Sequence, residues 1–84
     1  MSLLEEYAHR CVESRGLDFQ RNLQVLRNYL KTLTDEDATF YINRINQIDE
    51  LRMLWAAGLN RTLQLAVTRR YEQIITYLSR GIPP

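Results

Sequence analysis

The sequence predicts an all-α fold, a small bundle of four antiparallel helices joined by short linkers, in a single domain over residues 1–84. Each glycine is followed by a large apolar residue. This pair is typical of a helix C-terminus, because the glycine adopts a left-handed conformation and the apolar side chain folds back on the last turn. Residues that can cap helix N-termini stand at the expected helix starts, and no segment alternates as a β-strand does. The three pairs are Gly16-Leu17, Gly58-Leu59 and Gly81-Ile82.

The first two helices of the predicted bundle are amphipathic. The first begins after Ser2, which forms a capping box with Glu5, and Asp18 is expected to cap the second. Leu26 and Leu30 stand at the centre of the second helix's apolar stripe, so we expect both side chains to be buried. The two stripes consist of Leu4, Tyr7, Ala8 and Cys11 in the first helix, and of Phe19, Leu23, Leu26, Leu30 and Leu33 in the second.

The apolar residues of the third and fourth helices do not fall on one side. The third helix opens at Thr34, in a capping box with Asp37, and the fourth is capped by Asn60. The apolar side of the third helix shifts along its length, and Arg70 interrupts that of the fourth. The stripe residues are Ala38, Tyr41, Ile42, Ile45 and Ile48, then Leu51, Leu54 and Trp55, in the third helix, and Leu63, Val67, Ile74 and Leu78 in the fourth.

This pattern has two interpretations. Either the helices break, near residues 46–49 and 69–71, or they are continuous, with one apolar face for the core and one for a partner. A broken fourth helix, TLQLAVTRRYEQIITYLSRG, resembles the helix pair of an ankyrin repeat, and DELRMLWAAG resembles the second helix of a preceding repeat. The segment between Gly58 and Thr62 is too short for the hairpin finger of such repeats, so we assign the chain to no family.

Arg70 requires a polar partner in both interpretations, because a guanidinium that is buried without one is strongly destabilising. The first three helices are rich in acids. We therefore expect an ion pair with Asp49 or Glu50, and backbone carbonyls or solvent are the other options.

The composition argues against several classes of protein. A formal net charge of +1 gives no reason to expect a general attraction to nucleic acid or to a membrane surface. We expect no membrane span and no leader, because no apolar run has the required length or position. One cysteine, Cys11, cannot form an internal disulfide, so we expect a cytoplasmic protein in which Cys11 is a buried core residue.

The residues needed for catalysis are sparse. One histidine and one cysteine cannot fill a structural zinc site within one chain, and there is no phosphate-binding loop or nucleophile elbow. Glu6 and His9 have the spacing of a metal-binding pair, but they lie opposite the apolar stripe and are expected to face solvent. We expect a non-enzymatic protein that uses no cofactor, metal ion or small-molecule substrate.

The leading hypothesis for function is a protein–protein interaction module. Residues 40–78 carry more apolar surface than one small core requires, and the simplest partner for it is a second copy in a homodimer. The residues expected at this interface are Phe40, Leu51, Leu54, Trp55, Leu65 and Ile75.

The alternative is a small DNA-binding regulator with a helix-turn-helix-like segment around residues 50–72. Residues 59–84 hold four arginines against one acid, a net charge of +3, whereas the rest holds seven basic against nine acidic groups, a net charge of −2. Leu54 and Gln64 stand where this motif requires a small and a branched apolar residue, so a helical hairpin corner at Gly58 fits better. In this alternative the contacts with phosphates come from Arg61, Arg69 and Arg70.

Overall fold

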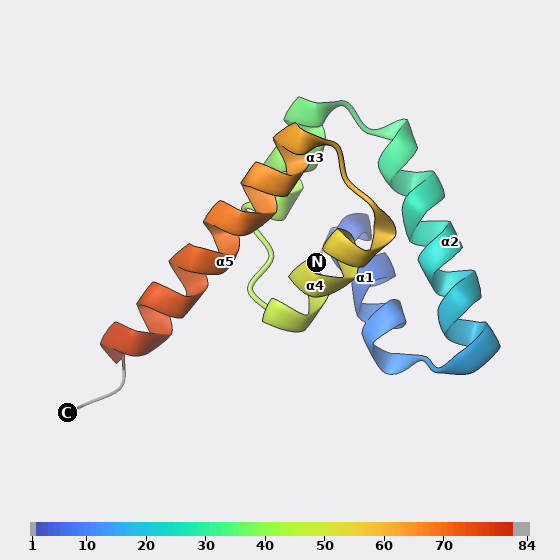
Figure 1. Cartoon of the computed structure of the whole chain (residues 1–84), viewed down its shortest axis with the longest axis horizontal. Coiled ribbons are helices and arrows are strands. Elements are labelled where there is room, and N and C mark those ends of the chain that lie inside the picture. Colours follow the sequence, from blue (N-terminus) through green and yellow to red (C-terminus); the bar gives the residue numbers. More distant parts are fainter. Residues whose placement is uncertain (1, 82–84) are drawn as a thin grey trace.

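Residues 2–81, the part of the chain that the structure describes, form five α-helices and no strand in the computed structural model (Figure 1). The all-α prediction is confirmed, but the predicted bundle of four helices is not, because the predicted third helix is broken and five helices result. Residues 43–47 interrupt it, close to the break expected at residues 46–49. The helices are α1 (Leu3–Glu13), α2 (Gly16–Thr32), α3 (Asp35–Ile42), α4 (Ile48–Ala57) and α5 (Arg61–Gly81).

Side-chain caps fix three helix starts where the sequence predicts them. The hydroxyl of Ser2 accepts a hydrogen bond from the Glu5 amide at 3.2 Å, and the Thr34 hydroxyl accepts one from the Asp37 amide at 3.1 Å. Asn60 caps α5 by accepting a hydrogen bond from the Leu63 amide at 2.9 Å. Its amide group also donates to an Asp35 carboxylate oxygen at 2.8 Å, which ties the α4–α5 corner to the start of α3.

The expectations at the first glycine pair are wrong. α1 ends at Glu13, and Gly16 opens α2 with a φ of 61° instead of closing α1. Asp18 therefore lies inside the first turn of α2 and does not cap it. An acid in the first turn still favours the helix, because it meets the positive end of the helix dipole. At the third pair, Gly81 is helical, and Ile82 lies outside the described residues, as do Pro83 and Pro84.

Gly58 ends α4 as predicted, but its φ of 89° and ψ of 112° differ from the left-handed helical conformation expected there, and L-amino acids rarely adopt this φ. Apart from residue 58 and its two chain neighbours, no heavy atom of the described residues lies within 4 Å of where a Cβ would stand, so a side chain has space and only the backbone opposes it. We expect Gly58→Ala to lower the free energy of unfolding by about 1–2 kcal/mol, the cost of a positive φ in a residue with a Cβ. Urea denaturation followed by circular dichroism measures this difference. An unchanged midpoint would mean that residue 58 has a negative φ in solution.

The core is built around α4. α1 packs on α2 and α4, α2 also contacts α4, and α5 packs on α3 and α4. Leu26 and Leu30 are buried as predicted, and so is Cys11, where burial raises the pKa of the thiol. The buried apolar residues are Leu4, Ala8, Cys11, Leu26, Leu30, Ala38, Ile42, Ile45, Leu51, Leu54, Ala57, Leu63, Ala66, Val67 and Ile74.

The break expected near residues 69–71 is absent, because α5 is one continuous helix. The resemblance to an ankyrin helix pair therefore does not extend to the fold. The C-terminal half of α5 extends away from the other helices (Figure 1), and Ile74 is the last residue of α5 with a buried side chain in the described part of the chain. Ile75, Tyr77 and Leu78, which follow Ile74 on α5, are exposed.

Candidate protein-interaction surface

Two of the six residues expected at an interface lie in the core. Leu51 is 1% exposed and Leu54 is 0% exposed, so neither side chain is accessible to a second protein. The expectation is corrected because α1, α2 and α5 all contact α4, and these helices cover Leu51 and Leu54. The other four residues, Phe40, Trp55, Leu65 and Ile75, are exposed.

Phe40 and Leu65 do not form one surface with the others. The Arg44 guanidinium lies over the Phe40 ring, 4.2 Å from its centroid, so the chain itself covers part of this side chain. Leu65 and Ile75 are separated by almost three turns of α5 and point to different sides of it, at about 100° per residue.

Trp55 and Ile75 belong to a continuous apolar strip on α4 and α5. On α5, Tyr71, Ile75 and Leu78 follow one another at intervals of four and three residues, the spacing that places side chains on one side of a helix. Trp55 of α4 joins them, because it lines one small apolar notch of about 150 Å³ together with Tyr71. We call these four residues the α4–α5 strip. Tyr71 and Leu78 were not among the residues expected at an interface, although their spacing from Ile75 in the sequence places them on the same side of a helix.

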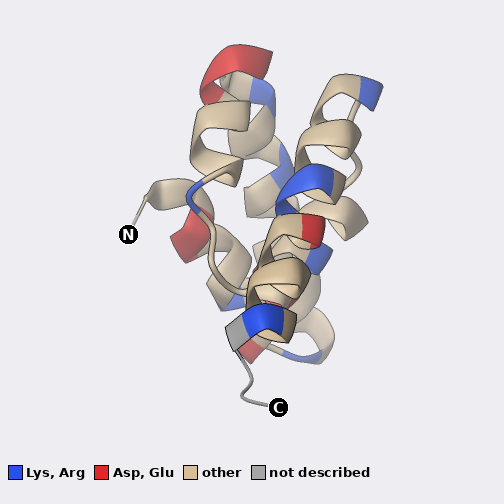
Figure 2. Cartoon of the chain, turned by 90° about the vertical axis from the view of Figure 1, so that its left-hand side faces the viewer, with Lys and Arg blue, Asp and Glu red and all other residues tan. Residues whose placement is uncertain are grey.

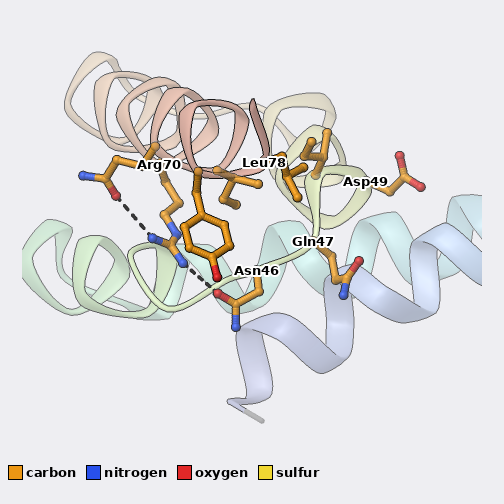
Figure 3. Close-up of a pocket in the computed structure, with 9 residues that line it drawn as sticks. Asn46, Gln47, Asp49, Arg70 and Leu78 are labelled. Atoms are coloured by element: carbon orange, nitrogen blue, oxygen red, sulfur yellow. Dashed lines mark hydrogen bonds between the residues drawn. The ribbon is translucent and has the colours of Figure 1, made fainter. Parts of the chain in front are cut away.

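A wider groove of about 810 Å³ lies beside the strip, between the segment that leads into α4 and the C-terminal half of α5 (Figure 3). Leu78 lines this groove and also belongs to the strip, so the two features are adjacent. The residues that line the groove are Asn46, Gln47, Ile48, Asp49, Arg70, Gln73, Ile74, Tyr77 and Leu78.

Arg70 forms no ion pair with Asp49 or Glu50, so that expectation is wrong. Its Nε donates to the Ile45 carbonyl at 2.8 Å, and its two Nη atoms donate to the side-chain oxygens of Asn46, at 2.7 Å, and Gln73, at 3.2 Å. The break at residues 43–47 frees the Ile45 carbonyl, and Arg70 satisfies it. The Asp49 carboxylate points away from Arg70 (Figure 3).

The arginines of the DNA-binding alternative divide into two kinds. Arg61 and Arg69 are exposed, whereas the guanidinium of Arg70 is engaged in the hydrogen bonds to its own chain. α5 carries four arginines and one acid, Glu72 (Figure 2).

At the corner that precedes α5, Gln64 donates a hydrogen bond to the Leu59 carbonyl at 3.1 Å, so this residue holds the turn through a polar contact.

Glu50 is the one buried charged residue in the described part of the chain. Its Oε2 lies 3.6 Å from Nδ1 of His9, and its Oε1 has no hydrogen-bond partner. The Nε2 atom of His9 lies 2.9 Å from a Glu13 oxygen, so the His9 side chain, which was expected to face solvent, lies between Glu13 and Glu50 and is 44% exposed. Within residues 2–81, no group of three or more His, Cys, Asp or Glu side chains is arranged to hold a metal ion.

Burial raises the pKa of Glu50, the nearby charge of Glu5 raises it further, and His9 opposes both effects. A carboxyl group whose pKa is raised by folding contributes stability that is complete below its ordinary pKa and is lost as the pH rises through the raised value. Gln cannot ionise, so Glu50→Gln should retain stability as the pH rises through that window, where the wild type loses it. Urea unfolding at a series of pH values measures the difference. The exposed Glu36→Gln variant is the control and should keep the wild-type dependence, whereas the same dependence in Glu50→Gln would contradict the prediction.

No family model, curated protein or solved structure matches this chain. Among the helices of residues 2–81, none has both the length and the apolar composition that crossing a membrane requires.

Proposed function

We propose that this chain is a non-enzymatic protein-interaction module that forms a homodimer through the α4–α5 strip. The observation that carries the proposal is the strip itself, because Trp55, Ile75 and Leu78 are exposed beside the half-buried Tyr71. Such exposed clusters are typical of interfaces, in which aromatic residues are enriched. The single cysteine favours a reducing compartment, so we also propose that the protein is cytoplasmic.

The exposed area of the molecule supports a second copy as the partner. The chain exposes 6000 Å² at a mass of 10.0 kDa, whereas a compact monomer of this mass exposes roughly 5,200 Å². The excess is roughly 800 Å², which is about the area that each partner buries in an interface of standard size.

Sedimentation velocity over a dilution series tests the proposal. We expect a wild-type dimer, and we expect Trp55→Ala to raise its dissociation constant at least about 30-fold, because central aromatic residues dominate such interfaces. The matched control is Phe40→Ala. The two side chains are almost equally exposed, Phe40 at 52% and Trp55 at 50%. Phe40 is outside the strip, because it belongs to α3 and its ring lies under the Arg44 guanidinium. A wild type that stays monomeric at high concentration, or an unchanged dissociation constant in Trp55→Ala, would overturn the proposal.

DNA binding is the second candidate, and the exposed positions of Arg61 and Arg69 on α5 favour it. The same experiment distinguishes the two when duplex DNA is added at two salt concentrations. Binding to phosphates weakens steeply as salt increases. A salt-sensitive complex that is lost in Arg69→Ala and kept in Trp55→Ala would support the DNA-binding candidate over the homodimer.

A further inference from the structure

The α4–α5 strip is bordered by opposite charges on its two sides. On α5, Glu72 borders the strip on the side away from α4, where it shares a hollow with Gln73, Thr76, Tyr77 and Arg80. On α4, Arg52 borders the other side of the strip. It lines the notch with Trp55, and, one turn before Trp55 in the sequence, it lies further from α5 around the circumference of α4. The order across the surface is therefore Glu72, the α5 part of the strip, Trp55 and Arg52.

Glu72 and Arg52 form no strong ion pair within the described residues. Glu72 is the only acid of α5, and it takes part in no ion pair within residues 2–81. Arg52 is the only basic residue of α4, and its contact with Asp49 spans 3.9 Å between side chains that are both more than 60% exposed. Exposed pairs of this kind contribute little to stability, so Arg52 is free to pair with another carboxylate.

Glu72 and Arg52 also lie at the same level along α5. Arg52 lines the same notch as Tyr71, and Glu72 directly follows Tyr71 in the sequence. Two identical surfaces can pack face to face about a two-fold axis that lies in the plane between them. If the axis runs along α5, the Glu72 border of one copy faces the Arg52 border of the other at the same height along the helix. If the axis runs across α5, each border faces the same border of the other copy, so like charges meet.

We propose, on the basis of the proposed homodimer, that the two copies pack through the α4–α5 strip about a two-fold axis that runs along α5. Glu72 of each copy then faces Arg52 of the partner subunit, and this contact occurs twice. Trp55 packs on the α5 part of the partner's strip. The opposite charges on the two borders favour this arrangement over the one in which like charges meet, because juxtaposed like charges disfavour association.

Charge reversal tests the arrangement. Arg52→Glu and Glu72→Arg each place like charges together twice, so each should raise the dissociation constant of the dimer about tenfold at low salt. The double variant restores two opposite pairs and should return to within about threefold of the wild type. Salt at about 1 M should abolish the differences, because it screens exposed charges. Arg21→Glu, an exposed arginine of α2, is the control for net charge and should have little effect.

The outcomes separate the arrangement from the proposed function. If the single reversals have the effect of the Arg21→Glu control, or if the double variant remains as weak as the singles, the axis along α5 is wrong. The homodimer still stands in that case if Trp55→Ala weakens it. If the wild type is monomeric throughout the dilution series, both proposals fail. All substituted side chains are exposed, and melting temperatures measured in parallel confirm that each variant is folded.

Discussion

Leu26→Ala is expected to lower the free energy of unfolding by about 2–5 kcal/mol, from the lost transfer of apolar atoms and from the cavity that remains. Leu26 is 0% exposed, and it belongs to the helix that packs against both α1 and α4. Because small domains unfold at a cost of only about 5–15 kcal/mol, this one substitution removes a large part of the total. Urea or thermal denaturation followed by circular dichroism measures the loss.

The control for Leu26→Ala is Leu17→Ala, the same change in the same helix at a side chain that is 72% exposed. It should change the stability by less than about 0.5 kcal/mol, as is usual for surface positions. If the two variants have the same denaturation midpoint, Leu26 is not at the centre of the core in solution.

Arg70→Met is expected to lower the free energy of unfolding by about 2–3 kcal/mol. Met keeps an unbranched apolar stem but removes the hydrogen bonds to the Ile45 carbonyl and to the Asn46 and Gln73 side chains. Hydrogen bonds from a charged donor contribute about 1.5–3 kcal/mol, and the Ile45 carbonyl is left without this partner. Chemical denaturation of the variant measures the loss.

A double-mutant cycle identifies the partner of Arg70. Combining Arg70→Met with Asn46→Ala should give a coupling of about 1 kcal/mol, because the two side chains are hydrogen-bonded at 2.7 Å. Combining Arg70→Met with Asp49→Ala should give no coupling within error, because the Asp49 carboxylate points away from Arg70. The opposite pattern would restore the ion pair expected from the sequence.

The sequence by itself determined the helical class and most of the helix starts. Ser2, Thr34 and Asn60 cap helices as predicted, because a cap needs only a side chain and an amide three residues further on. Asp18 shows the limit of such local signals, since it has cap chemistry but lies within α2. The helix starts earlier at Gly16, whose positive φ provides the turn out of α1.

Only the tertiary structure decided which of the ambiguous helices breaks. Both predicted breaks rested on the same pattern of shifted apolar residues, yet residues 43–47 interrupt one helix and α5 continues through the other position. Arg70 is tolerated in the apolar face of α5 because its guanidinium donates hydrogen bonds to a backbone carbonyl and to two amide side chains. Backbone carbonyls occur at every residue, so no charge pattern in the sequence could identify this partner.

Exposure of the apolar side chains also depended on the tertiary structure. The sequence predicted surplus apolar surface in residues 40–78 but not which residues carry it. Leu51 and Leu54 are covered because three helices surround α4, whereas Leu78 is exposed at the edge of the groove beside the start of α4. Periodicity places a residue on a side of its helix, but the neighbouring helices determine whether that side is covered.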